Sequence, residues 1–358
     1  MIKQMNNTDN AGLIGQDISH PEIIRELFGE PAARDKILSD IRSDPALLST
    51  WNSFSEKDRE DILLFLEGRQ GLQILYDGFF KHIFRPDEIP ERVESLISAI
   101  LGEPVKILQV LSREGSSISD SGSQVIMDII VKTQSGAIVT VEMQRIGYLF
   151  PGERSSCYIA DMIMRQYQLT RSEKGKDFSY TDMRPVTLIV LMEKSSREFR
   201  EVAPEYIHRR AEHYSSGAKV SNLENVIYIS LDTFHEQGQN IIDNKLNAWL
   251  SFFSCNEPDK IIELVSMYPE FIPLYKDIAQ FRKSPGEVIG MFSEALKIMD
   301  RNTTTYMIEE LARERDEAVS ERDNAFSERD EAVSERNKAV SEVDRLRALL
   351  EANGIPLD

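Results

Sequence analysis

The chain has 358 residues, of which 41% are hydrophobic, so it can bury a core of ordinary size in one or two domains with appendages. No apolar run approaches the roughly 18 residues of a membrane span, and MIKQMNNTDN lacks the pattern of a secretory signal, so we expect a cytoplasmic protein without membrane contact. The net charge of −18 argues against a protein that coats nucleic acid non-specifically.

Residues 1–70 are predicted to form an N-terminal helical extension. The segment SEKDREDILLFLEG shows the pattern most clearly, because Ser55 is a favourable N-cap and Gly68 a favourable stop. No residue in this part suggests chemistry.

Residues 71–235 are predicted to form a mixed α/β domain. Two helices, LQILYDGFFKHIF and PERVESLISAILG, are followed by the strand VKILQVLSRE and by a hairpin; the long helix PGERSSCYIADMIMRQYQLTRSEKG comes next, and two strands, RPVTLIVLME and NVIYISLDTF, flank a further helical stretch. Residues 71–200 hold 16 Lys and Arg against 17 Asp and Glu, so this part remains compatible with a polyanionic substrate. Cys157 and Cys255 stand far apart and in no metal-binding spacing, which predicts reduced thiols.

The rest of the chain is predicted to be helical. Residues 236–311 form a helical C-terminal region, and residues 312–358 contain the seven-residue repeats ERDEAVS, ERDNAFS, ERDEAVS and ERNKAVS. A strict period of seven is typical of a coiled coil, which predicts a homo-oligomer formed through residues 312–350. The apolar seam is thin, however, so a solvated charged helix is the alternative.

The hairpin MDIIVKTQSGAIVTVEMQ, residues 127–144, places one carboxylate in each of two apolar runs. Runs that are apolar on both faces are typical of central strands covered on both sides. If the loop is residues 134–136, with its glycine in the left-handed conformation, Asp128 lies opposite Glu142 with β-carbons roughly 5 Å apart. A two-residue loop would instead place Asp128 across from Met143.

Two acids that face each other in a water-poor setting need compensation, because desolvating a carboxylate costs several kcal/mol. One acid could stay protonated, both could pair with Lys or Arg, or a divalent cation could lie between them. Mg²⁺, which prefers carboxylates and phosphate oxygens, explains the predicted geometry best, and Gln144 would point to the same face as Glu142 because strand side chains alternate. The alternative is that the acids lie on an edge strand or a bulge and meet water.

At these residues the sequence resembles the PD-(D/E)XK nuclease superfamily, specifically the Rpn family of recombination-promoting nucleases and transposases. The resemblance covers residues 72–311 and rests on the blocks YDGFFKHIF, MDIIVKTQSGAIVTVEMQ, ERSSCYIADMIMRQYQ and RPVTLIVLME, together with the helical segments PDKIIELVSMYPEFIPLYKDI and MFSEALKIMDRNTTTYMIEEL. It implies a restriction-endonuclease-like α/β core, a mixed sheet flanked by helices, with helical extensions at both ends and a heptad-repeat tail.

The resemblance further implies that Asp128 and Glu142 bind Mg²⁺ or Mn²⁺ together with the Met143 carbonyl. The superfamily usually has Lys two residues after the Glu, whereas this chain has Gln144, which can orient water but supplies no charge. The identity of the general base therefore stays open.

Lys81 and Asp77, one helical turn apart, are the candidates for supplying the positive charge that Gln144 does not carry. Lys81 would bring in the missing cation, and Asp77 would be an outer metal ligand or hold Lys81 in place. The alternative is a surface ion pair between the two residues.

The long helix carries further candidates at helical spacing on a polar side, opposite Ile159, Met162 and Ile163. These candidates are Arg154, Tyr158, Asp161 and Arg165. We predict that Arg154 and Tyr158 hold the phosphate backbone of the substrate, and that Arg165 is instead an arginine paired with a core acid.

The sequence thus predicts an Mg²⁺-dependent DNA endonuclease that hydrolyses phosphodiester bonds and promotes recombination or transposition. The alternative is a catalytically degenerate DNA-binding or assembly protein of the same fold, oligomerised by its coiled-coil tail. Gln144 and the acidic isoelectric point favour this alternative.

Overall fold

The computed structural model describes residues 21–72, 77–112, 128–146, 151–211, 214–236 and 241–352. The chain divides into two units, residues 1–302 and 303–358. The α-helices are α1 (Pro21–Phe28), α2 (Arg34–Ser43), α3 (Pro45–Ser53), α4 (Glu56–Leu66), α5 (Asp77–Phe84), α6 (Pro90–Leu101), α7 (Pro151–Lys174), α8 (Arg197–Arg200), α9 (Leu231–Glu236), α10 (Lys245–Ser254), α11 (Pro258–Met267), α12 (Ile272–Phe281) and α13 (Pro285–Ala352).

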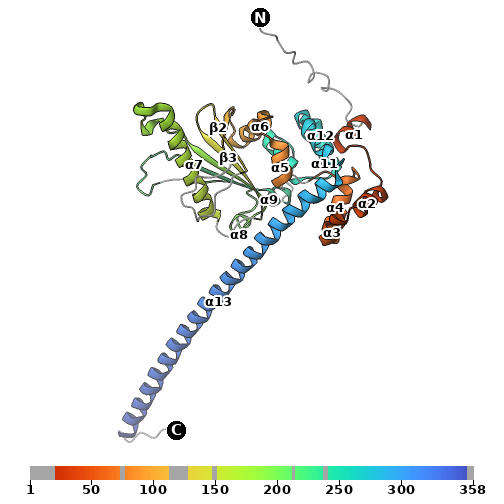
Figure 1. Ribbon diagram of the computed structural model, residues 1–358. Coiled ribbons are helices and arrows are strands. Elements are labelled where there is room, and N and C mark those ends of the chain that lie inside the picture. Colours follow the sequence, from red (N-terminus) through yellow and green to blue (C-terminus); the bar gives the residue numbers. More distant parts are fainter. Residues whose placement is uncertain are drawn as a thin grey trace. The chain divides into compact units, whose positions relative to one another are not determined.

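A mixed sheet of six strands forms the centre of the first unit (Figure 1). The strands are β1 (Ile107–Val110), β2 (Ile129–Thr133), β3 (Ile138–Ile146), β4 (Val186–Lys194), β5 (Ile207–Arg209) and β6 (Glu224–Ser230). Their order is β1-β2-β3-β4-β6-β5, in which β3, β4 and β6 run parallel and the remaining neighbours pair antiparallel. This arrangement confirms the predicted mixed sheet flanked by helices.

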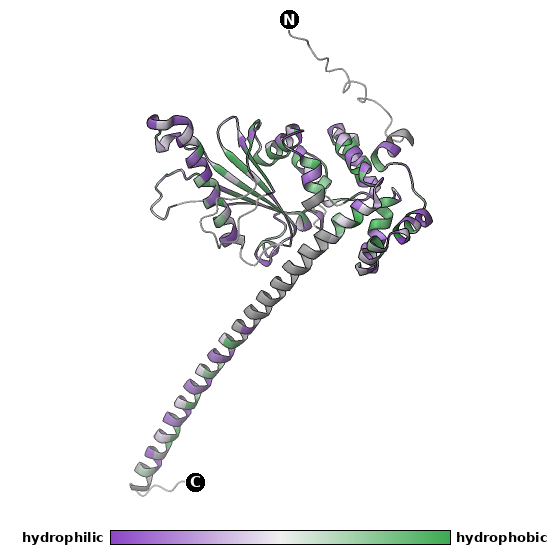
Figure 2. Ribbon diagram, in the orientation of Figure 1, coloured by the Kyte–Doolittle hydropathy of each residue, from purple (hydrophilic) through white to green (hydrophobic). Residues whose placement is uncertain are grey.

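Helices cover both faces of the sheet, which is why most residues of its central strands are apolar (Figure 2). Alternate residues of β2, β3, β4 and β6 enter a larger core with α5, α6, α9 and α10, and the residues between them enter a smaller core under α7. In β2, for example, Ile129 and Val131 belong to the larger core and Ile130 to the smaller one.

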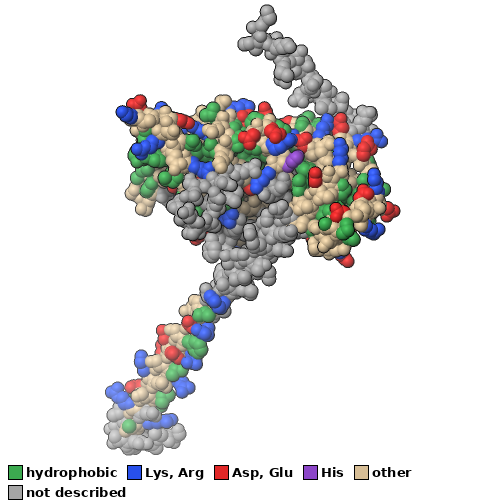
Figure 3. Space-filling model, viewed as in Figure 1, with side chains coloured by type: hydrophobic (Ala, Val, Ile, Leu, Met, Phe, Trp, Pro, Cys, Tyr) green, Lys and Arg blue, Asp and Glu red, His purple; other side chains and the backbone are tan. Residues whose placement is uncertain are grey.

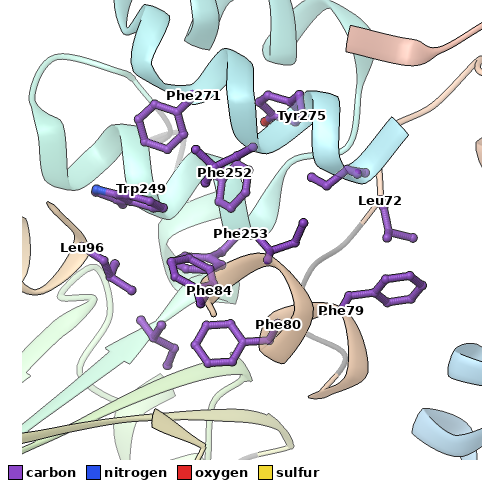
Figure 4. Close-up of a cluster of buried hydrophobic side chains, with 14 of the residues drawn as sticks. Leu72, Phe79, Phe80, Phe84, Leu96, Trp249, Phe252, Phe253, Phe271 and Tyr275 are labelled. Carbon is purple, nitrogen blue, oxygen red and sulfur yellow. The ribbon is translucent and has the colours of Figure 1, made fainter. Parts of the chain in front are cut away.

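Stacked aromatic rings fix α5 against α10 within the larger core (Figure 4). The ring centroid of Phe84 lies 5.8 Å from that of Phe253, which lies 6.1 Å from that of Trp249. Phe80 is also fully buried and contacts both Phe84 and Phe253. Because Lys81 directly follows Phe80, this packing determines where the Lys81 side chain leaves the helix.

Helix α4 of the N-terminal extension begins and ends as its sequence predicts. The Ser55 hydroxyl accepts a hydrogen bond from the Asp58 N–H at the start of α4, and Gly68, just beyond its end, has φ +72°. Residues of α1 to α4 enter the larger core together with residues of α10 to α13. The two helical extensions therefore share one core with the sheet.

Two segments differ from the prediction. The strand NVIYISLDTF stops at Ser230, and its last residues form α9, because Asp232 turns back to accept hydrogen bonds from the N–H and hydroxyl of Ser195 (2.8 and 2.5 Å). The stretch between β4 and β6 is predicted to be helical, but its described residues, 195–211 and 214–223, contain the four-residue helix α8 and the short edge strand β5, besides turns and loop.

Charged side chains of both signs are spread over the face of the first unit seen in Figure 3. In the described part of the chain, no helix is long and apolar enough to cross a membrane. Neither cysteine forms a disulfide; Cys157 is exposed and Cys255 is buried.

Candidate active site

The turn between β2 and β3 sets the register of the two acids. Thr133 donates its N–H to the Ala137 carbonyl (2.9 Å), so the loop has three residues, and its last residue, Gly136, has φ +86°. Ile129 pairs with Val141. The predicted three-residue loop is therefore confirmed, and the two-residue alternative is wrong.

Continuing this register by one residue places Asp128 opposite Glu142, and two crossed hydrogen bonds join them. The Asp128 N–H donates to Glu142 Oε1 (3.1 Å), and the Met143 N–H donates to Asp128 Oδ2 (2.8 Å). Both acids lie on the sheet face covered by α7, because they alternate with residues of the larger core. Only 5% of Glu142 is exposed.

The environment of Glu142 disfavours its ionised form. Burial and, next, the negative charge of Asp128 raise the pKa of Glu142 well above its ordinary range. The Asp128 N–H, the Thr140 hydroxyl and the positive charge of Arg154 oppose this rise. The pair therefore holds a proton to higher pH than ordinary carboxyl groups do, and a bound cation would displace it.

The donor set fits a hard divalent cation. Two facing carboxylates are typical Mg²⁺ ligands, and the Met143 carbonyl faces β2 like the Met143 N–H, since both groups of one residue point to the same antiparallel neighbour. The residues described contain no cluster of three or more His, Cys, Asp or Glu with metal-binding geometry. Among the described residues, the protein would contribute two carboxylates and one carbonyl.

Lys81 reaches the acid pair from the opposite side of the sheet. Its Nζ lies 3.9 Å from Asp128 Oδ1, and 28% of its side chain is exposed. The structure therefore places Lys81 where the sequence predicts a cation. Asp77 is the first residue of α5, but its side chain lies outside the described residues.

Gln144 lies two residues beyond Glu142 on β3, next to Met192 of β4, and is partly buried. Strand alternation directs it to the face of Glu142. It therefore lies at the edge of the site, as predicted.

The positive charge of Arg154, on the first turns of α7, opposes the rise in the pKa of Glu142. Arg154 also donates to the Tyr158 hydroxyl (2.9 Å), and its guanidinium carbon lies 5.4 Å from the Tyr158 ring centroid. The predicted position of Tyr158 on the polar side of the helix is wrong. Only 6% of it is exposed, because its ring enters the smaller core beside Ile159 and Met162.

Arg165 and Asp161 form an ion pair at 2.6 Å with side chains 12% and 9% exposed. Arg165 also donates to the Ser112 carbonyl (2.7 Å). This is the arrangement expected for an arginine paired with a core acid, and it sets Arg165 apart from Arg154.

Thr140 is a site residue that the sequence reasoning missed. It is fully buried, and its hydroxyl contacts the Ile129 carbonyl (2.7 Å) and Glu142 Oε1 (3.3 Å). A hydroxyl two residues before Glu142, in an otherwise apolar strand, is the signal that could have identified it.

Comparison with known proteins gives one match. The model of a family described as PD-(D/E)XK nuclease family transposase covers residues 75–330, which is more than half of the chain. Neither the curated proteins nor the solved structures contain a match.

Proposed function

The chain belongs to the PD-(D/E)XK nuclease family transposases, and from this premise we propose that it is a metal-dependent DNA endonuclease that hydrolyses phosphodiester bonds and promotes recombination or transposition. The observation that supports this most is the facing pair of acids, Glu142, which is buried, and Asp128, whose side chain is 16% exposed. Glu142 accepts a hydrogen bond from the Asp128 N–H, and Asp128 accepts one from the Met143 N–H. The backbone of the hairpin therefore holds the two carboxyl groups close together. Stability alone does not explain such an arrangement, because like charges in a buried site are unfavourable.

Asp128, Glu142 and the Met143 carbonyl would hold Mg²⁺ or Mn²⁺. When bound, the ion would polarise the phosphodiester and lower the pKa of the attacking water. Gln144 would orient this water through its amide.

Two cations would approach the substrate from opposite faces of the sheet. Lys81 on α5 contacts Asp128, and Arg154 on α7 acts on Glu142. Lys81 would offset the negative charge that develops at the phosphate, as the absent lysine at position 144 would otherwise do, and Asp77 would support Lys81. Arg154 would hold the phosphate backbone, and Tyr158 would position its guanidinium through the hydrogen bond between them.

We predict that the purified chain nicks supercoiled plasmid in Mg²⁺ or Mn²⁺ and not in EDTA. Asp128→Ala should lower the rate by about 10³-fold or more, because it removes a metal ligand. Asp177→Asn, a change at an exposed acid, is the matched control and should leave the rate unchanged. Equal nicking by wild type and Asp128→Ala would reject the assigned site.

Gln144 favours one competing function, a degenerate protein that binds DNA without cutting it. Calorimetric titration with Mn²⁺ separates the two. A nuclease site should give heat of binding that Asp128→Ala removes, whereas a degenerate site should give no such heat in the wild type.

For the second unit we propose self-association through the repeat. Apolar side chains recur every seven residues along α13 and are between 40% and 52% exposed. These are Val319, Phe326, Val333 and Val340. A second copy of the same helix would cover this stripe.

We expect the double change Phe326→Asp and Val333→Asp to lower the molar mass measured by light scattering to that of a monomer. The matched double change Glu331→Ala and Lys338→Ala, at exposed positions five residues after Phe326 and Val333 and so on the far side of the helix, should keep the oligomer. A wild-type chain that is already monomeric would contradict the proposal.

A further inference from the structure

Helix α5, which carries Lys81, is too short to be stable without contacts to the rest of the protein. It has 8 residues, and isolated helices shorter than about 12 residues are marginal in water. Lys81 lies in its last turn, whose carbonyls have no partner within the helix. Whether the Lys81 Nζ stays 3.9 Å from Asp128 Oδ1 therefore depends on what holds this end of α5.

Arg92, on α6, is buried against the end of α5. Its Nη1 donates to the Ile83 carbonyl (2.7 Å), so it satisfies one of the open carbonyls in the turn that carries Lys81. The guanidinium also lies at the negative end of the helix dipole, where a positive charge is favourable. Arg92 thus fixes the last turn of α5 directly.

A carboxylate from the helical C-terminal region holds Arg92 in this position. Asp277 Oδ2, on α12, lies 2.7 Å from Arg92 Nη2 and 3.6 Å from Arg85 Nη2. In the described part of the chain, Asp277 is the acid paired with Arg92, whereas Arg85 also pairs with Glu88 (2.8 Å). Because the Arg92 side chain is only 9% exposed, its charge depends on this acid.

Aromatic contacts join α5 to the same C-terminal helices. The Phe79 ring lies edge-on to Phe281 of α12 and Phe292 of α13, with centroids 5.0 and 5.8 Å apart. The His82 ring, one helical turn further along α5, lies 4.7 Å from that of Phe281. These rings determine which side of α5 faces α12, whereas the hydrogen bond from Arg92 acts on the turn that carries Lys81.

We propose that Arg92 and Asp277 are positioning residues that hold Lys81 at the acid pair, so that catalysis requires the helical C-terminal region. The proposal rests on the proposed function in taking Lys81 as a catalytic cation. Without the Asp277 carboxylate, the Arg92 guanidinium would move toward water and release the Ile83 carbonyl, because a desolvated charge without its partner is unfavourable. The last turn of α5 would then open, and Lys81 would leave Asp128.

Pulse acetylation of the full chain with acetic anhydride in EDTA, read by mass spectrometry, tests this positioning without requiring activity. The Lys81 side chain is 28% exposed beside Asp128. Asp277→Asn should raise the rate of Lys81 acetylation by about threefold or more, because the last turn of α5 opens more often. Lys132, which is buried and pairs with Glu173, should stay protected and so report that the fold is intact.

Two further variants make the labelling test specific. Arg92→Lys keeps the positive charge but lacks the planar fork that reaches the Ile83 carbonyl and Asp277 together, so it should also raise Lys81 acetylation. Glu270→Gln is the matched control. It breaks an exposed ion pair with Lys245 in the same C-terminal region and should leave Lys81 acetylation unchanged.

Plasmid nicking shows whether this positioning is used in the reaction. Asp277→Asn should lower kcat about fivefold to tenfold with KM nearly unchanged, since Lys81 acts in the transition state rather than in DNA binding. In a Lys81→Ala background the same change should cost less than about twofold, because the residue it acts through is already absent. A change that only destabilised the protein would lower the activity of both backgrounds equally.

The outcomes separate this proposal from the nuclease assignment. Unchanged Lys81 acetylation in Asp277→Asn and Arg92→Lys overturns the positioning proposal, whether or not the wild type nicks plasmid. Equal loss of nicking with and without Lys81 also overturns it. Raised acetylation in a protein that does not nick supports the positioning of Lys81 and rejects the nuclease assignment instead.

Discussion

Glu142→Gln is expected to abolish plasmid nicking and, at the same time, to stabilise the metal-free protein at pH 8. The loss of nicking should reach about 10³-fold or more, because an amide neither carries the negative charge that binds the metal nor takes part in water activation. The gain in stability arises because glutamine keeps the shape of the side chain and removes a charge that burial and Asp128 make unfavourable.

The pH dependence of this gain has a defined sign. The pKa of Glu142 is raised above its ordinary value of 4.5 in the folded protein, so the folded state binds more protons than the unfolded chain at neutral pH. The stability of the wild type, relative to that of Glu142→Gln, is therefore retained below pH 4.5 and falls as the pH rises toward the raised pKa of Glu142. Each unit of upward shift corresponds to about 1.4 kcal/mol.

Thermal unfolding in EDTA at pH 5 and pH 8 measures this difference. Glu142→Gln should melt above wild type at pH 8, by about 2–4 °C for each kcal/mol, and approach it at pH 5. Glu103→Gln, a change at an exposed glutamate, should follow wild type at both pH values. Adding Mn²⁺ should raise the melting temperature of wild type only. A wild type that is more stable than Glu142→Gln in EDTA at pH 8 would show that the buried charge is already compensated without metal.

The position of the acid pair could be predicted from sequence because it depends on local rules. A three-residue loop that ends in glycine fixes the register, and strand alternation then places Asp128 opposite Glu142. The approach of Lys81 to this pair does not follow from local rules, since it depends on how α5 packs. That packing is set by Phe80 and Phe84 against α10, far along the chain.

Tyr158 shows where helical periodicity fails. Because Tyr158 has a hydroxyl and lies at helical spacing from Arg154 and Arg165, its sequence position suggests a polar side chain. Its ring is large and apolar, however, and fills the smaller core under α7. The hydroxyl then meets Arg154, so Tyr158 supports a charged residue from inside the protein. Polarity alone gives no indication of this arrangement.

The contact between the start of α7 and β6 could not be predicted from sequence, because it joins distant segments of the chain. Ser155 and Tyr228 are joined by a hydrogen bond across 73 positions of the chain. The parallel pairing of β3, β4 and β6 creates this contact, and no local pattern encodes the order of parallel strands. The short strand β5, which pairs with β6, was itself missed.

The second large effect is expected at Arg282, which connects the C-terminal helices to the N-terminal extension. Arg282 follows α12 and is 9% exposed; it donates to the carbonyls of Phe65 (2.6 Å) and Gln70 (2.9 Å). Its guanidinium carbon lies 4.4 Å from the Phe65 ring centroid. Burial lowers the pKa of Arg282 to about 9, so it still carries its charge at pH 7.

Arg282→Met should lower the free energy of unfolding by about 2–4 kcal/mol. Methionine keeps much of the volume but removes the guanidinium donor from the buried Phe65 carbonyl and the half-buried Gln70 carbonyl, at about 1–3 kcal/mol each. Removing the desolvated charge offsets part of this loss. The neighbouring change Lys283→Met, at an exposed lysine, should cost less than about 0.5 kcal/mol. Urea unfolding gives the free energies, and hydrogen exchange should show that protection is lost first in α2 to α4, since the Phe65 and Gln70 carbonyls lie at the end of α4 and just beyond it. Equal stability of the two variants would mean that apolar packing alone holds the N-terminal helices in place, and that the guanidinium contributes nothing that a thioether of similar size cannot supply.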